Sequence, residues 1–223
     1  MLKLDLHIHS NYSEDAIGTP KEIIKYAIKI GLNGIAITDH NTVKGGLKAE
    51  EIKPNNFIVI PGIEISTKDG HLLALNVRKD IPSHRTLIET IELIKEEGGI
   101  PIVPHLFRNL SGIKKEKLYE VYKKIPAIEV YNGCSLPKTN LKTFRIAREL
   151  NIGGTGGSDT HIPIYTGYAY TTVDINDISV DSVLDEIIKK KTWGIGKTLP
   201  FSYRRDRMIL SIKQFFHRGF RRI

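Results

Sequence analysis

The chain opens with apolar and polar side chains alternating at the period of a β-strand. Leu2, Leu4 and Leu6 fall on one face, so we predict a strand over Leu2–His7. A helical spacing follows, with apolar residues on one face of Lys21–Ile30 behind Thr19, a good N-cap residue. A strand therefore leads directly into a helix.

This alternation of short β-branched runs and longer helical stretches continues through most of the chain. Further strands are expected at Ile35–Thr38, Phe57–Ile63, Ile100–Pro104, Ala127–Tyr131, Ile152–Gly157, Tyr168–Val173 and Trp193–Ile195, with His71–Val77 as a hairpin extension. Further helices are expected at Leu87–Glu97, Lys114–Lys124, Thr139–Leu150 and Asp181–Lys190. Six or seven such units favour an α/β barrel over an open sheet, although spacing alone does not close the ring.

The positive charge of the chain is concentrated at its C-terminal end. The net charge is +8, and residues 201–223 carry seven basic side chains against the single Asp206, a net of +6 that leaves +2 for residues 1–200. Apolar residues recur there at helical spacing, at Met208, Ile209, Ile212, Phe215, Phe216 and Phe220. This basic amphipathic tail fits a helix docked on the barrel, a helix on an anionic membrane, or an arm along a nucleic-acid backbone.

Composition indicates an ordinary globular chain. Of the 223 residues 40% are hydrophobic and 26% charged, and no apolar run approaches the roughly 20 residues that cross a bilayer. Cys134 is the only cysteine, which excludes an internal disulfide. We therefore expect a cytoplasmic protein without a signal peptide or transmembrane segment.

Histidine and acidic side chains cluster where the predicted strands end. A lone histidine at such a position is usually capped or solvated, and Asp39 could simply cap the next helix. Six of the eight histidines at the same end of the strands are harder to explain in that way, because a barrel gathers its active site from several strand ends. The clusters are His7 with His9, Asp39 with His40, Glu64, His71, His105, and Asp159 with His161.

This set of side chains suits divalent cations. Imidazoles and carboxylates without thiolates favour Zn, Mn or Fe. A bridging carboxylate can hold two cations about 3.5–4 Å apart, where one lowers the pKa of a bound water and the others hold phosphoryl oxygens. The residues therefore favour hydrolysis of a phosphate ester.

The same residues resemble the successive motifs of the PHP (polymerase and histidinol phosphatase) superfamily. The resemblance rests on Asp5–Ser10, Ile37–His40, Pro61–Ile65, Val103–His105 and Gly157–His161, in order along residues 5–173. It implies a distorted (β/α)7 barrel, a TIM-like fold of PHP type, over residues 1–200, followed by the basic tail.

The resemblance also implies a site for two or three cations. His7, His9, Glu64 and Asp159 would hold the first cation, and Glu64 would bridge to a second held by His71 and His105. A third would be held by Asp15, His40 and His161, although Glu14 could compete with Asp15, which could also be a turn residue. Glu64, His105 and Asp159 would form the catalytic centre.

Four further residues are assigned outside this ligand set. Arg108 could reach the substrate phosphate, and Asn132, at another strand end, could orient the substrate. His84 and His217 lie outside every motif, and we interpret both as surface residues.

We therefore expect a phosphoesterase that hydrolyses a phosphate monoester or a terminal nucleotide phosphodiester by means of metal-bound hydroxide. Its partner would be a phosphate ester, a nucleotide or a nucleic-acid end, since the short stretch from Glu64 to His105 leaves no room for a large cap. One alternative is a histidinol-phosphate phosphatase. Another, of a different class, is an RNA-binding subunit resembling the non-catalytic protein component of ribonuclease P.

Overall fold

A computed structural model describes residues 1–218, with side chains described up to residue 212. Residues 219–223 and the side chains of residues 213–218 lie outside this description, as do the expectations for Phe215, Phe216, His217, Phe220, Arg221 and Arg222.

Within residues 1–218 nine strands form a single sheet in chain order, and eight of them close into a barrel because β1 also pairs with β8. The parallel neighbours are β1, β2 and β3, and then β5, β6 and β7, whereas β4, β8 and β9 run antiparallel to the strands beside them. The strands are β1 (Leu2–Ile8), β2 (Gly34–Ile37), β3 (Ile58–Thr67), β4 (Gly70–Leu75), β5 (Ile100–Val103), β6 (Ala127–Asn132), β7 (Gly153–Gly157), β8 (Ala169–Val173) and β9 (Trp193–Gly196). The predicted distorted barrel is confirmed, with the β3–β4 hairpin contributing an antiparallel strand.

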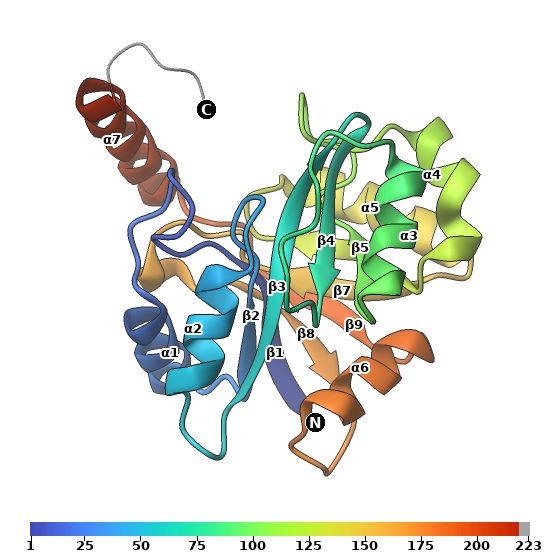
Figure 1. The fold of residues 1–223 in the computed structure, drawn as a ribbon, viewed down its shortest axis with the longest axis horizontal. Coiled ribbons are helices and arrows are strands. Elements are labelled where there is room, and N and C mark those ends of the chain that lie inside the picture. Colours follow the sequence, from blue (N-terminus) through green and yellow to red (C-terminus); the bar gives the residue numbers. More distant parts are fainter. Residues whose placement is uncertain (219–223) are drawn as a thin grey trace.

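Helices surround this barrel (Figure 1), and their starts follow local sequence signals. Thr19 and Glu22 form a capping box at α1, and Thr86 and Glu89 form another at α3. The helices are α1 (Pro20–Lys29), α2 (Lys44–Ile52), α3 (Leu87–Glu96), α4 (Lys115–Val121) with a 3-10 turn over Tyr122–Lys124, α5 (Pro137–Glu149), α6 (Val180–Ile188) and α7 (Phe201–Arg218).

Helix α2 is an element that the sequence pattern did not predict. It contains Gly45 and Gly46, which normally weaken a helix. Both are needed for close approach, because a Cβ on Gly45 would overlap the Asp39 carboxylate and one on Gly46 would meet Pro61. Packing against the end of β2 and against β3 thus overrides the weak helical propensity.

Apolar side chains fill the body of the barrel and leave one end to polar groups. Leu4, Leu6, Ile60, Leu73 and Ile102 are fully or almost fully buried in one cluster. Other clusters fill the space under α1 and α2 and under α3, α4 and α5. Buried polar side chains gather instead at the carboxyl ends of the parallel strands, where the barrel carries its candidate site.

The tail forms helix α7, whose first turns pack on the barrel while its far end extends away from it (Figure 1). Tyr203 is buried with Ile162, Tyr165 and Leu199, and Leu210 packs against the same cluster. Met208, Ile209 and Ile212, which a docked helix would bury, are exposed.

The division into a domain over 1–200 and a tail over 201–223 stays a prediction. No helix within residues 1–218 is long and apolar enough to cross a membrane.

Candidate metal centre

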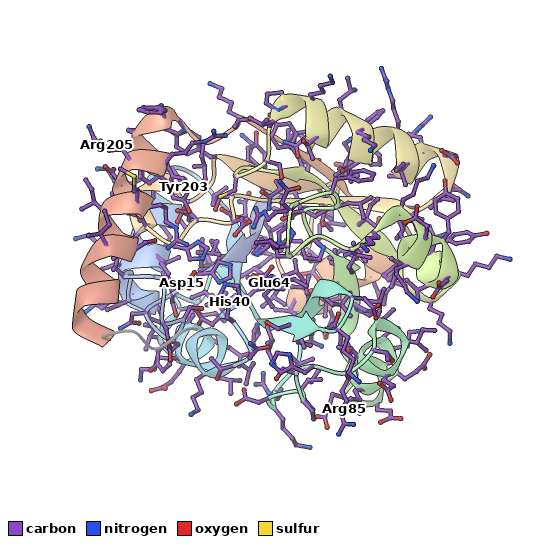
Figure 2. The ribbon with its side chains drawn as sticks, turned by 90° about the horizontal axis from the view of Figure 1, so that it is seen from above. Asp15, His40, Glu64, Arg85, Tyr203 and Arg205 are labelled. Carbon is purple, nitrogen blue, oxygen red and sulfur yellow. The ribbon has the colours of Figure 1, made fainter. Side chains whose placement is uncertain are left out.

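The structure brings the predicted ligands together from six strands and the loops that follow them. His7 lies on β1 with His9 just beyond it, Glu64 lies on β3 and His71 on β4, and the others follow β1, β2, β5 and β7. Their donor atoms form overlapping groups that could hold metal ions. Figure 2 shows Asp15, His40 and Glu64 on the side of α7 that faces the barrel.

The most regular group comprises His7, His9, Glu64 and Asp159, all buried. The Nε2 atoms of the two histidines are 3.2 Å apart. Glu64 Oε2 lies 3.5 Å from His7 Nε2 and 3.3 Å from His9 Nε2, and Asp159 Oδ1 lies 3.6 Å and 3.4 Å from the same atoms. These five distances lie between 3.2 and 3.6 Å, so both carboxylates face the same pair of imidazole nitrogens.

These spacings suit donors to a divalent cation. Donors about 2.1 Å from one tetrahedral ion lie about 3.4 Å from each other. Four donor atoms in a buried cup, two of them carboxylate oxygens, have the spacing and charge that a divalent cation requires. The residues present therefore fit the cation that the sequence predicted here.

Glu64 directs its second oxygen to a different pair of imidazoles. Its Oε1 lies 2.9 Å from His71 Nδ1 and 2.7 Å from His105 Nε2. The carboxylate therefore stands between two donor groups, which is the position of a bridging ligand. The His71 side chain is 23% exposed and that of His40 26%, whereas His7 and His9 are fully covered, so the centre opens to solvent beside His40 and His71.

A third group lies on the side facing α7. Asp15 Oδ2 is 2.9 Å from His161 Nε2 and 3.7 Å from His40 Nε2, and the His161 ring stacks on His9. Asp15 Oδ1 is buried without a hydrogen-bond partner among the described residues, as is expected of an atom that awaits a cation. Glu14 lies at the exposed surface, so the geometry favours Asp15 over Glu14 as the third carboxylate.

Crowding of charges separates the pKa values of these groups. Burial alone would lower the pKa of His9, but hydrogen bonds to Asp159 and Glu64 outweigh burial and raise this pKa to about 9. Burial and the neighbouring His9 charge lower the pKa of His40 to about 3 and that of His161 to about 4. Burial also opposes ionisation of Glu64, yet the nearby imidazoles hold its pKa well below the usual range.

Glu129 on β6 supports this centre, and the sequence reasoning missed it. Its Oε1 is 3.0 Å from His7 Nδ1, and its Oε2 accepts a hydrogen bond of 2.9 Å from the backbone N–H of His105. A carboxylate next to a ligand imidazole fixes the orientation of the ring. The available signal was an acid inside the apolar run Ala127–Val130, since a carboxylate is costly to bury without a cation or a hydrogen-bond donor.

Two other acids shape the loops around the centre. Asp39 accepts hydrogen bonds of 2.6 Å from Ser10 N and 3.0 Å from Ser13 Oγ, so its side chain holds the loop after β1. Asp5 accepts from the backbone N–H groups of Ser158 and Gly167, and its burial raises its pKa to about 7. Both acids lie in motifs that the sequence singled out, but they bind loops and not the donor groups.

Arg108 and Asn132 lie beside Asp159. The guanidinium of Arg108 donates to Asp159 Oδ2 and, over 3.1 Å, to Asn132 Oδ1. Asn132 is fully buried, and its amide donates to Asp159 and Glu129. Arg108 is 29% exposed, whereas Asn132 is buried and contacts its neighbours, so the predicted contacts of both residues with substrate stay predictions. His84 is exposed, as expected.

The fold and the donor groups together define a closed α/β barrel with a histidine and carboxylate centre able to bind metal. The chain belongs to the PHP domain family. The model of the PHP domain matches residues 5–140, and that of a PHP-associated segment matches residues 137–192.

Individual relatives agree with this family. The chain is 34% identical to the uncharacterized protein MJ1587 of Methanocaldococcus jannaschii over 59% of this chain and 82% of that protein. It is 34% identical to a 5′-3′ exoribonuclease of Haemophilus influenzae over 45% of this chain and only 38% of the enzyme. A two-domain Bacteroides vulgatus protein containing a predicted PHP-like metal-dependent phosphoesterase superposes with a TM-score of 0.69 at 21% identity, over 88% of this chain and 65% of that one.

Proposed function

We propose that this protein hydrolyses a phosphate monoester or a terminal nucleotide phosphodiester with two or three divalent cations, Mn, Zn or Fe. The observation that carries the proposal is the buried pair of imidazoles, His7 and His9, which both Glu64 and Asp159 face, joined through Glu64 to a second donor pair. When bound, such cations would lower the pKa of a water and neutralise phosphoryl oxygens.

The residues around the donors have separate roles in this proposal. His71 and Asp15 would complete the neighbouring cation sites with His105, His40 and His161. Arg108, partly exposed beside Asp159, would donate to a phosphoryl oxygen of the substrate. Glu129 and Asn132, both buried, would hold His7, Asp159 and Arg108 in place.

The exoribonuclease relative supports a nucleotide or a nucleic-acid end as substrate, although this chain spans little more than a third of that enzyme. The complete donor set argues against a purely RNA-binding role, since such a role would not need buried acids facing histidines. Histidinol phosphate remains the competing substrate, and the assay distinguishes it.

The test combines metal analysis of the purified protein with an assay of p-nitrophenyl phosphate, bis-p-nitrophenyl phosphate, nucleotides, 5′-labelled oligonucleotides and histidinol phosphate. We expect bound cations and activity that chelators abolish and that favours the diester and nucleotide substrates. A preference for histidinol phosphate would favour the alternative. RNA retention without turnover of any ester would overturn the enzymatic proposal.

One variant tests the donor set directly. His9→Ala should lower turnover by at least about 100-fold, because losing even an outer partner of a metal ligand costs about 10–100-fold. The matched control is His84→Ala, which changes an exposed histidine outside the cluster. Retained activity in His9→Ala would contradict the proposed mechanism.

A further inference from the structure

Helix α7 lies outside both segments that match the family, which end at residue 192, yet it forms one wall of a cavity beside the metal centre. The cavity has a volume of about 340 Å³. The residues that matter here are Asp159 and His161 on the inner wall, Arg108 at one side, and Tyr203, Arg204 and Arg207 of α7. A cavity of this size accommodates more than a single phosphate group.

Two contacts fix α7 at the centre. The Tyr203 hydroxyl lies 3.3 Å from both Asp159 O and His161 N, and the tyrosine side chain is buried. Arg207 donates to Asp15 O and, over 3.2 Å, to Asp15 Oδ2. Figure 2 shows Tyr203 on the barrel-facing side of the helix and Arg205 on the outer side.

Three guanidinium groups line the cavity. They differ in whether a carboxylate of the protein neutralises their charge. Arg108 is paired with Asp159, and Arg207 with Asp15. Arg204 is exposed, and no hydrogen bond or ion pair joins it to any residue up to 212. Arg204 and Arg207 are three residues apart on α7, so they lie on the same side of the helix. The outer wall therefore presents positive charge that the protein itself does not neutralise.

We propose that Arg204 and Arg207 form an anion-binding subsite that receives a second anionic group of the substrate, next to the phosphate that is hydrolysed. This inference rests on the proposed function, because the scissile phosphate would lie at the inner wall beside Asp159 and His161. The substrate is then an ester whose alcohol part is itself anionic. The next phosphodiester of a 5′-phosphorylated oligonucleotide has this chemistry, and so has a small bisphosphate.

The test compares three substrates for the wild type and Arg204→Gln: p-nitrophenyl phosphate, a 5′-phosphorylated dinucleotide and fructose 1,6-bisphosphate. We expect the wild type to prefer at least one of the two doubly anionic substrates. The substitution should reduce that preference, measured as a ratio of kcat/KM values, by about tenfold, since it removes a charge-assisted contact. Preference for the dinucleotide alone identifies a polynucleotide end as the source of the second anion, and preference for the bisphosphate alone identifies a small ester.

The control is Arg205→Gln, which changes the neighbouring arginine on the outer side of α7, where it pairs with Asp206. It should leave all three activities and the preference unchanged. A wild type without preference for either doubly anionic substrate, or an unchanged preference in Arg204→Gln, would overturn the subsite while leaving the phosphoesterase proposal standing.

A binding measurement covers the case in which no substrate is turned over. Calorimetric titration of the full-length protein with the 5′-phosphorylated dinucleotide and with fructose 1,6-bisphosphate should give, for at least one of the two, a Kd about tenfold weaker for Arg204→Gln than for the wild type. Equal affinities of the two proteins for both ligands would refute the subsite even if the protein has no hydrolytic activity. Circular dichroism of the variant confirms that α7 is still folded.

Discussion

Glu64 shows how one residue can organise this centre. Its two oxygens face different imidazoles: Oε2 faces those of His7, His9 and His40, and Oε1 faces those of His71 and His105. A buried carboxylate without such partners would be costly, so its place inside an apolar strand already points to a cation or to donors. The structure supplies both the donors and the space between them.

Glu129 contacts the outer nitrogen of the His7 ring, on the side away from Glu64. We predict that Glu129→Gln weakens cation binding or activity by about 10–100-fold, because the amide no longer provides a charged partner for the His7 ring. The measurement is competitive chelator titration alongside steady-state kinetics. The matched control is Glu149→Gln at the surface, where the carboxylate only accepts from Tyr119. Equal affinities for the Glu129 variant and the wild type would show that Glu129 does not support the ligand.

The pKa values predict how cation binding depends on pH. The pKa of His9 is raised to about 9, so its imidazole is protonated at pH 7 in the metal-free protein, and a cation must displace that proton. Binding at the His7 and His9 group should therefore release protons at pH 7 and strengthen as pH rises to about 9. His40 and His161, with pKa values of about 3 and 4, are already neutral and release none.

Calorimetry in two buffers of different ionisation enthalpy measures this release. The slope of the apparent enthalpy against the buffer enthalpy should show net proton release at pH 7 for the wild type and less for His9→Ala. A slope of zero for the wild type at pH 7 would mean that the imidazoles are already free to bind.

Helices α2 and α7 show why the local sequence pattern and the tertiary packing can favour different structures for the same segment. Helix α2 carries Gly45 and Gly46 where the chain must approach Asp39 and Pro61, so its composition indicates a loop. Helix α7 has the amphipathic spacing of a docked helix, but it docks through Tyr203 and Leu210 and leaves Met208 exposed. In both cases contacts with distant residues decide the outcome.

Docking of α7 makes a prediction about stability. Tyr203→Ala should destabilise the protein by about 2–4 kcal/mol, because it empties a buried site shared with Tyr165 and Leu199. Phe201→Ala, at a side chain 82% exposed, should change stability by less than about 0.5 kcal/mol. Urea denaturation of both variants measures the difference. Equal midpoints and slopes for Tyr203→Ala and the wild type would show that α7 does not depend on this contact.

Most strands and helices follow from the sequence because the apolar spacing that defines them is local, as in Leu2–His7 and Leu87–Glu97. The candidate ligands follow from a second rule, that strand ends meet at one rim. The β1–β8 pairing, the role of Glu129 and the arginines of α7 depend on contacts between residues far apart in sequence. Asp39 shows the converse, since it occupies a strand end but turns away to bind Ser10 and Ser13.

The molecule is a barrel with an apolar body and a polar rim. Its body is filled by apolar side chains such as Leu4 and Ile60, which makes the β-strands rigid supports. The histidines and acids extend from the ends of those strands, so their donor atoms are held at fixed spacings before any cation arrives. We therefore expect this rim to hold divalent cations.

Crystallography with anomalous scattering from crystals soaked in Mn²⁺ shows directly whether cations bind there. We predict a strong peak beside His7 Nε2 and His9 Nε2, with a further peak near Glu64 Oε1 between His71 and His105. The absence of any peak beside these imidazoles at saturating Mn²⁺, with peaks only at surface carboxylates, would show that the rim is not a metal centre.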